Sequence, residues 1–205
     1  MFNLPSLHQI ALMLPAIVIG LTFHEYAHGL VAYRLGDDTA RLQGRLTINP
    51  AAHVDPVGLV LLFLAGFGWA KPVPVNPLSF TGDMRRGMLL VSLAGPATNL
   101  LMAIAAVVIH LALVDLRLPY FTEIMFYIIY INVVLAIFNL LPIPPLDGSK
   151  ILAGILPGRQ EWLYHLEAYG MIILILLVFS GAIGYIFKIF VIPIVNVLLR
   201  LAGIF

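Results

Sequence analysis

Long apolar runs separated by short polar stretches make up most of the chain. The first run, residues 9–35, is long enough for one helix of about 40 Å at 1.5 Å per residue. Because the hydrocarbon core of a bilayer is about 30 Å thick, a helix of this length crosses it. Residues 84–114, 120–141 and 162–183 are predicted to span in the same way, and residues 185–205 to cross or to lie in the interface.

Three short segments do not fit the spanning pattern. Residues 42–49 alternate between apolar and polar side chains, and this period of two predicts a short strand. Residues 57–70 are apolar but short and cut by glycines, so they are predicted to re-enter the membrane without crossing it. Residues 71–77 contain three prolines, which forbid a helix and leave an extended segment. Extended backbone at membrane depth must be buried in protein or face water, so this segment is expected to line a cavity.

The composition supports a membrane protein. The chain has 205 residues, of which 61% are hydrophobic and 10% charged, and its mean hydropathy of +1.03 is far too high for a soluble domain. No linker of domain-boundary length and no clear internal repeat divides residues 1–205, which are expected to form one domain. The predicted fold is an all-α polytopic membrane protein, a bundle of about four to six transmembrane helices with a small membrane-embedded β or re-entrant element.

The net charge of +1 gives no reason to expect nucleic acid as a partner or a strongly basic lipid-binding face. The distribution of basic residues predicts the orientation instead. If residues 57–70 re-enter without crossing, Arg117 and Lys188 lie on one side of the membrane and most other basic residues on the opposite side: Arg34, Arg41, Arg45, Lys71, Arg85, Arg86, Lys150 and Arg159. The positive-inside rule makes this second side cytoplasmic.

The candidate chemistry lies inside the first apolar run. His24 and His28 are four positions apart, and Glu25 follows the first of them. On a helix the two imidazoles lie on one face, one turn apart, so both can reach the same cation. A zinc hydrolase needs three protein ligands, an open position for water, and a carboxylate that takes a proton while the water attacks a carbonyl. The motif supplies two ligands and the base, and the third ligand must come from elsewhere.

In soluble proteins the same motif also occurs by chance on solvated helices. Here the flanking residues 14–23 and 29–33 are apolar, and ionisable residues at membrane depth are costly and usually functional. Cysteine is absent from the chain, which leaves histidine and carboxylate as the strong ligands for a metal. The pattern therefore favours a functional metal site over a chance occurrence.

Asp147 is the favoured third ligand. It follows a proline-rich break in the apolar pattern, and the predicted topology places it toward the same membrane face as His24 and His28. A helix-capping aspartate before a glycine is the structural alternative. Four other residues compete for the ligand position, two near the re-entrant segment and two that open a later helix: His53, Asp55, Glu161 and Glu167.

Two amide side chains and one histidine are candidates for contacts with a substrate. Asn99 and Asn139 lie within apolar runs, where a carboxamide can donate to a developing oxyanion. Hydrogen bonding between helices in lipid is the alternative for both residues, and it is favoured for Asn139. His53 stands at the mouth of the re-entrant segment, where support of the substrate is favoured over ligation of the metal.

Five segments together resemble the site-2 protease family of intramembrane zinc metalloproteases, in its compact prokaryotic branch. The resemblance extends over nearly the whole chain, and the segments that carry it are residues 23–37, 44–58, 66–77, 93–99 and 138–148. The resemblance implies one zinc ion bound by His24, His28 and Asp147, with Glu25 as the catalytic base and residues 95–99 near the substrate. No PDZ insertion and no CBS domain accompanies these motifs.

The expected function is hydrolysis of peptide bonds within or next to the transmembrane segments of other membrane proteins. The expected location is a bacterial or archaeal plasma membrane, with the active site toward the cytoplasm and with transmembrane proteins and the lipid bilayer as partners. One alternative is a metal-binding transporter, which spreads ionisable residues across the membrane depth, whereas this chain concentrates them at one end. The other is an inactive relative that only binds membrane partners.

Overall fold

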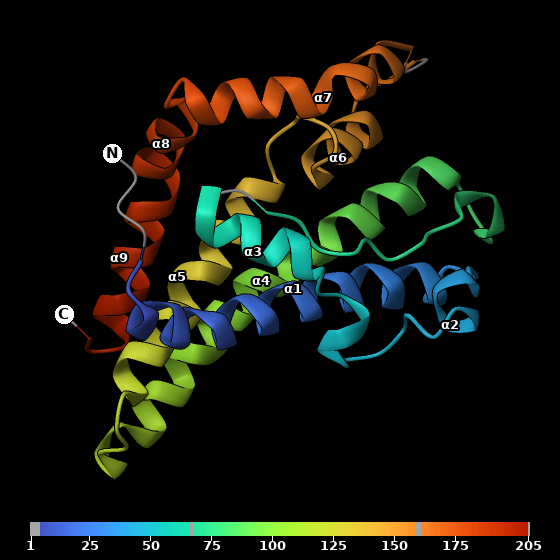
Figure 1. Ribbon diagram of the computed structural model, residues 1–205. Coiled ribbons are helices and arrows are strands. Elements are labelled where there is room, and N and C mark those ends of the chain that lie inside the picture. The colour runs from blue at the N-terminus through green and yellow to red at the C-terminus, as the bar shows by residue number, and fades with distance from the viewer. Residues whose placement is uncertain (1–4, 66–67, 159–160, 205) are drawn as a thin grey trace.

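The computed structural model describes residues 5–65, 68–158 and 161–204 (Figure 1). Within these ranges the chain is helical and no strand occurs. The helices are α1 (Leu7–Arg34), α2 (Thr39–Leu42), α3 (Pro56–Ala65), α4 (Met84–Leu113), α5 (Phe121–Asn139), α6 (Asp147–Ile155), α7 (Glu161–Phe179), α8 (Ala182–Ile186) and α9 (Ile192–Leu201). A π-helical stretch, Phe187–Val191, joins α8 to α9, and 3₁₀ turns lie at Pro50–Ala52, Pro77–Ser79 and Val114–Leu116.

Four helical stretches of the described chain are long and apolar enough to cross a membrane. They are Leu7–Arg34, Met84–Leu116, Phe121–Asn139 and Ala182–Leu201. The predicted all-α polytopic membrane fold is therefore confirmed. The core between α1, α4 and α5 contains small side chains, among them Ala16 and Ala103, which are fully buried and let the helices approach closely.

The last span runs from the end of the bundle that holds His24 to the opposite end. Near its start, the Phe187 ring contacts the Phe138 ring of α5 at a centroid distance of 6.5 Å, and the neighbouring Asn139 lines a cavity with His24. Beyond its end, the carbonyl of Ala202 lies 2.9 Å from Nδ1 of His110, in the last turn of α4. The span α8 to α9 is therefore antiparallel to α5.

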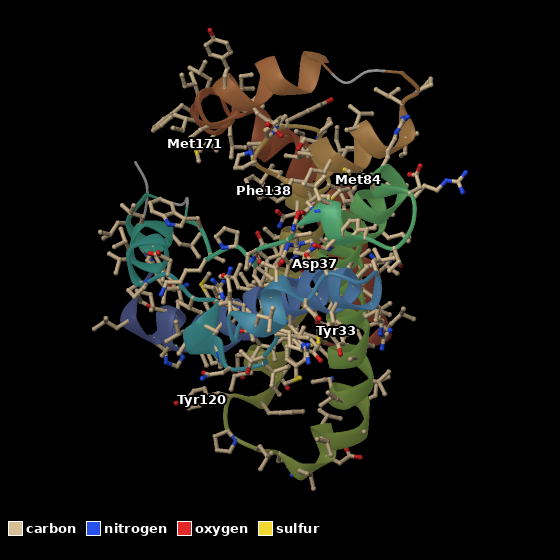
Figure 2. All side chains as sticks on the ribbon, turned by 90° about the vertical axis from the view of Figure 1, so that its right-hand side faces the viewer. Tyr33, Asp37, Met84, Tyr120, Phe138 and Met171 are labelled. Carbon is tan, nitrogen blue, oxygen red and sulfur yellow. The ribbon has the colours of Figure 1, made fainter. Side chains whose placement is uncertain are left out.

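Helix α7 consequently begins and ends at the His24 end, and the predicted span at residues 162–183 is wrong. The middle of α7 lies at this end too, since a Cβ on Gly170 would meet the carbonyl oxygen of Pro144, three positions before Asp147. Figure 2 shows Met171 of α7 and Tyr120, which precedes α5, at opposite ends of the molecule. With this course of the chain, Lys188 lies in the half of its span nearer the His24 end, not on the opposite side as predicted. Arg159 lies outside the described residues.

The predicted strand at residues 42–49 is also wrong. The chain folds back on α2 at this point, because the N–H groups of Arg45 and Leu46 both donate to the carbonyl of Ala40, at 2.7 and 3.2 Å. Gly44 has a φ of +65°, which turns the backbone out of an extended course. No neighbouring segment pairs with these residues in the described chain, and the apolar Leu42 and Ile48 are exposed, so the period of two marks no buried face.

Helix α3 belongs to a hairpin, as its short length predicted. Val54 and Ala70 form an isolated antiparallel bridge that brings the two ends of the hairpin together. Ten residues of helix are about 15 Å long, half of what a bilayer requires. Residues 66–67 of this segment lie outside the described residues. The hairpin returns to the His24 end, where the chain continues into the extended residues 71–76.

Candidate metal centre

The structure brings His24, His28 and Asp147 together. The Nε2 atoms of the two histidines are 3.0 Å apart, and each lies close to Oδ2 of Asp147, at 3.1 Å for His24 and 3.2 Å for His28. Ligand atoms bound to one tetrahedral zinc at about 2.0–2.1 Å lie about 3.3–3.4 Å from one another. The three atoms are thus arranged almost as a single zinc ion requires.

The hydrogen bond at Nδ1 of each histidine shows which ring nitrogen carries the proton. Nδ1 of His28 lies 2.7 Å from the carbonyl oxygen of Val91, which can only accept, so this nitrogen carries the proton. Nδ1 of His24 lies 2.6 Å from Oδ1 of Asn99 and carries its proton for the same reason. In a neutral imidazole the remaining Nε2 is then a lone-pair acceptor.

Two imidazole lone pairs therefore converge on a carboxylate oxygen. Oδ2 of Asp147 is buried and has no hydrogen-bond donor. Three acceptors in contact without a donor repel one another, and a cation between them relieves the repulsion. The donor set of two imidazoles and one carboxylate is one that catalytic zinc uses. The residues present thus fit the metal that the sequence implied.

Gly95 of α4 provides the space for this arrangement. A Cβ atom at this position would lie 2.5 Å from Nε2 of His28 and 2.5 Å from Cε1 of His24. Carbon atoms in contact prefer about 3.5–4.0 Å, so any side chain here displaces the imidazoles. The absence of a side chain at residue 95 therefore lets α4 lie directly against the two histidines.

The polypeptide reaches Asp147 through a turn that also depends on glycine. Helix α6 begins at Asp147, after the proline-rich residues 142–145. A Cβ on Gly148 would overlap the carbonyl oxygens of Leu140 and Leu141, so the first turn of α6 packs on the turn before it. The backbone position of Asp147 is set by this close contact.

Glu25 and the metal-ligand candidates open into one cavity of about 230 Å³. Oε2 of Glu25 accepts a hydrogen bond of 2.8 Å from the N–H of Val73, in the extended segment 71–76. Pro72, Val73 and Val75 of this segment line the same cavity, together with Lys150. The expectation that this segment lines a cavity is confirmed.

The structure places Asn99 behind His24. The side chain is fully buried, and its Nδ2 donates to the carbonyl of Gly20 at 3.1 Å and to Oδ1 of Asn132 at 2.9 Å. Because both N–H groups have acceptors in the protein, the amide holds the His24 ring and has no donor left for an oxyanion. Asn132, which completes this chain of hydrogen bonds, was missed; a lone amide in the middle of an apolar run is the signal that could have identified it.

Asn139 lines the cavity and donates to the carbonyl of Leu135 at 2.9 Å, whereas His53, Asp55 and Glu167 are not among the lining residues. His53 is fully buried, and its Nε2 lies 2.7 Å from the carbonyl of Thr47. Asp55 caps the start of α3 by accepting from the N–H groups of Val57 and Gly58. Glu167 is exposed on α7, and the side chain of Glu161 lies outside the described residues.

The variant Asn99→Leu distinguishes support of the His24 ring from donation to an oxyanion, the two roles considered for this amide. Loss of an outer partner of a metal-binding histidine typically weakens metal binding about 10- to 100-fold. We expect this weakening for Asn99→Leu in a zinc titration of the purified protein. Asn196→Leu, at an exposed position of α9, is the matched control and should bind zinc as the wild type does. Unchanged zinc affinity combined with slow turnover would favour the oxyanion role instead.

The chain is similar to a peptidase family and to proteins whose names agree with a zinc site. The model of peptidase family M50 matches residues 116–182. YwhC of Bacillus subtilis, provisionally named a zinc metalloprotease, is 43% identical over 169 residues, which are 78% of this chain and 77% of YwhC. Rip2 of Mycolicibacterium smegmatis, with the same kind of name, is 31% identical over 84% of this chain and 68% of its own. MJ0611 of Methanocaldococcus jannaschii, also named in this way, is 29% identical over 74% of this chain and 75% of its own. No solved structure matches significantly.

Proposed function

Given that the chain belongs to peptidase family M50 and is a membrane zinc metalloprotease, we propose that it hydrolyses peptide bonds within or next to transmembrane segments of other proteins. The observation that carries the proposal is the convergence of His24, His28 and Asp147 on one point, next to Glu25, on a membrane-spanning helix. Because the cavity is lined by residues of a membrane-spanning helix, its substrates in this proposal are peptide segments that enter it from the bilayer.

Glu25 is the general base in this proposal. His24, His28 and Asp147 would hold the zinc ion, which when bound would act as a Lewis acid toward the scissile carbonyl and the water. The Glu25 carboxylate takes one proton from the attacking water and passes it to the nitrogen of the breaking peptide bond. The products are a new carboxylate and a new amine, so that one water is consumed for each bond cut. Oε1 of Glu25 has no hydrogen-bond partner among the described residues, which leaves it free for the water.

The cavity suits an extended peptide. The carbonyls of a helical substrate are hydrogen-bonded within the helix, so the segment must unwind before attack. The extended residues 71–76, three of which line the cavity, offer main-chain groups beside which an unwound peptide can lie as an added strand. Residues 42–49, which were predicted to be a strand, form none and offer no such edge.

The proposed location is a bacterial or archaeal plasma membrane with the cavity toward the cytoplasm. Basic residues gather at the His24 end of the bundle, where Arg34 ends α1 and Arg41 and Arg45 follow it. The positive-inside rule associates such an end with the cytoplasm. Water then has a short route to the cavity.

Removal of Asp147 tests the proposed third ligand. We expect Asp147→Ala to bind zinc more than about 100-fold more weakly than the wild type, since even outer partners of ligands contribute 10- to 100-fold. Measured zinc content after dialysis should fall from about one ion per chain to nearly none. Asp115→Ala, at an exposed position of the opposite end, should retain its zinc. Full zinc content in Asp147→Ala would remove this residue from the ligand set.

The proposed activity is tested with the purified protein in liposomes that also contain single-pass membrane proteins. Cleavage of any of them by the wild type, and not by a chelator-treated sample, supports the proposal. Zinc flux into the liposomes without cleavage, abolished by His24→Ala, would show a transporter instead. Binding of the single-pass proteins with neither cleavage nor flux would show an inactive relative.

A further inference from the structure

The extended segment 71–76 contacts the proposed catalytic base through a single N–H group. Pro72 and Pro74 have no N–H, so the central donor of the segment is that of Val73, which lies 2.8 Å from Oε2 of Glu25. The Val73 side chain is buried, and it packs on α1 one turn beyond Glu25, since a Cβ on Gly29 would lie 3.2 Å from it. The orientation of Glu25 thus depends on where this segment lies.

Asp37 anchors the segment on one side of Val73. This carboxylate is fully buried, and its Oδ2 accepts a hydrogen bond of 2.6 Å from the N–H of Asn76. Its Oδ1 accepts from the N–H and the hydroxyl of Thr39, at 2.9 and 2.5 Å. Burial alone raises the pKa of Asp37, but these hydrogen bonds from Thr39 and Asn76 outweigh it and lower the pKa below its usual value. Asp37 is therefore a charged acceptor, and Figure 2 shows it between the end of α1 and the start of α4.

Arg45 anchors the segment on the other side of Val73. Its Nη2 donates to the carbonyl of Lys71 at 2.8 Å and to the carbonyl of Pro72 at 3.1 Å. The N–H of Lys71 in turn donates to the carbonyl of His53 at 2.7 Å. The segment is therefore held by charged side chains at both ends, neither of which reaches the cavity itself.

We propose that Asp37 and Arg45 are positioning residues for catalysis, which hold segment 71–76 so that the Val73 N–H orients the Glu25 carboxylate. This inference rests on the proposed protease function. Asp37 and Arg45 both lie in the loop after α1, so the loop connects the end of the catalytic helix to the segment that orients its base. Since a misplacement of about 1 Å can cost as much as 100-fold in rate, loose anchors slow the chemical step.

The test compares Asp37→Asn with Asp38→Asn in zinc-loaded, full-length protein. The change Asp37→Asn brings an NH₂ group toward N–H donors, whereas Asp38 is half exposed and its carboxylate pairs, among the described residues, with Arg41 at 2.9 Å. We expect kcat of Asp37→Asn to fall about tenfold or more while KM for a peptide substrate changes less than about twofold. Zinc affinity and the visible spectrum of the cobalt-substituted protein should not change, and Asp38→Asn should match the wild type.

Two further measurements separate positioning from folding. Deuterium uptake by residues 73–76 should increase in Asp37→Asn and in Arg45→Met, with the thermal midpoint of the protein nearly unchanged. Because both anchors act through one segment, the double variant should lose little more kcat than the stronger single variant.

Each outcome bears on the inference. If Asp37→Asn cleaves as fast as Asp38→Asn in a protein whose wild type is active, the positioning role is overturned while the proposed function stands. Unchanged deuterium uptake overturns the anchoring whatever the activity. Failure of the wild type itself to cleave would overturn the proposed function and, with it, the catalytic part of this inference.

Discussion

Glu25→Gln is expected to reduce peptide-bond cleavage by about 10²- to 10⁴-fold, the usual contribution of a general base. Glutamine has nearly the same size, and its amide oxygen can still accept the hydrogen bond from Val73. It cannot take a proton from water at neutral pH. The loss should therefore appear in kcat, measured with a purified single-pass substrate, and the fold of the site should persist.

The zinc content of Glu25→Gln distinguishes loss of the general base from disruption of the metal site. Glu25 is not one of the three residues that converge, so Glu25→Gln should hold as much zinc as the wild type. Glu123→Gln, an exposed carboxylate at the opposite end of the molecule, should leave kcat unchanged. Wild-type turnover in Glu25→Gln would show that another group takes the proton. Loss of zinc would show that Glu25 contributes to binding the metal.

Gly95→Ala should nearly abolish zinc binding, and activity with it. The added Cβ would lie 2.5 Å from both His24 and His28, about 1 Å inside the normal contact distance. Helix α4 is packed against α1 by the small residues around this point and has little room to move away. The imidazoles must then rotate out of the geometry that brings their Nε2 atoms together. We expect zinc affinity to fall by about 100-fold or more, since the change disturbs two ligands at once.

Gly184→Ala is the matched control for Gly95→Ala. Both glycines lie within helical stretches, but a Cβ at residue 184 meets nothing within 4 Å. Alanine is favoured over glycine in a helix by about 1 kcal/mol, so this variant should be neutral or slightly more stable in thermal unfolding. Zinc affinity should equal that of the wild type. If Gly95→Ala also behaved like the wild type, the close packing of α4 on the histidines would be wrong.

The spanning helices could be predicted because run length and apolar composition determine them. Residues 9–35 and 120–141 closely match α1 and α5. The length of an apolar run does not show, however, whether its helix runs along the bundle or lies across one end of it, as residues 162–183 do. Only contacts far apart in sequence, such as that between His110 and Ala202, show that the last span begins at the His24 end. The pattern at residues 42–49 misled because alternation does not by itself show burial, and Leu42 and Ile48 are exposed on a turn.

The grouping of the candidate ligands could be predicted from residue types at fixed spacing. His24, Glu25 and His28 lie on one helix, where sequence spacing translates directly into space. Asp147 was favoured because the predicted topology placed it at the same end of the bundle. The partners of these residues could not be predicted in this way, because Asn132 and Asn99 meet only through the packing of α4 on α5. The role of Asp37 depends equally on a contact 39 positions along the chain.

The most direct test of proteolysis within the membrane is the mass of the fragments from a single-pass substrate cleaved in liposomes prepared in H₂¹⁸O. The proposed mechanism predicts a cut within or next to the membrane-spanning segment, with one ¹⁸O atom in the new carboxylate of the N-terminal fragment. Glu25→Gln should yield the intact substrate only. A cut solely in a loop far from the membrane, or fragments of the same mass from Glu25→Gln, would contradict it.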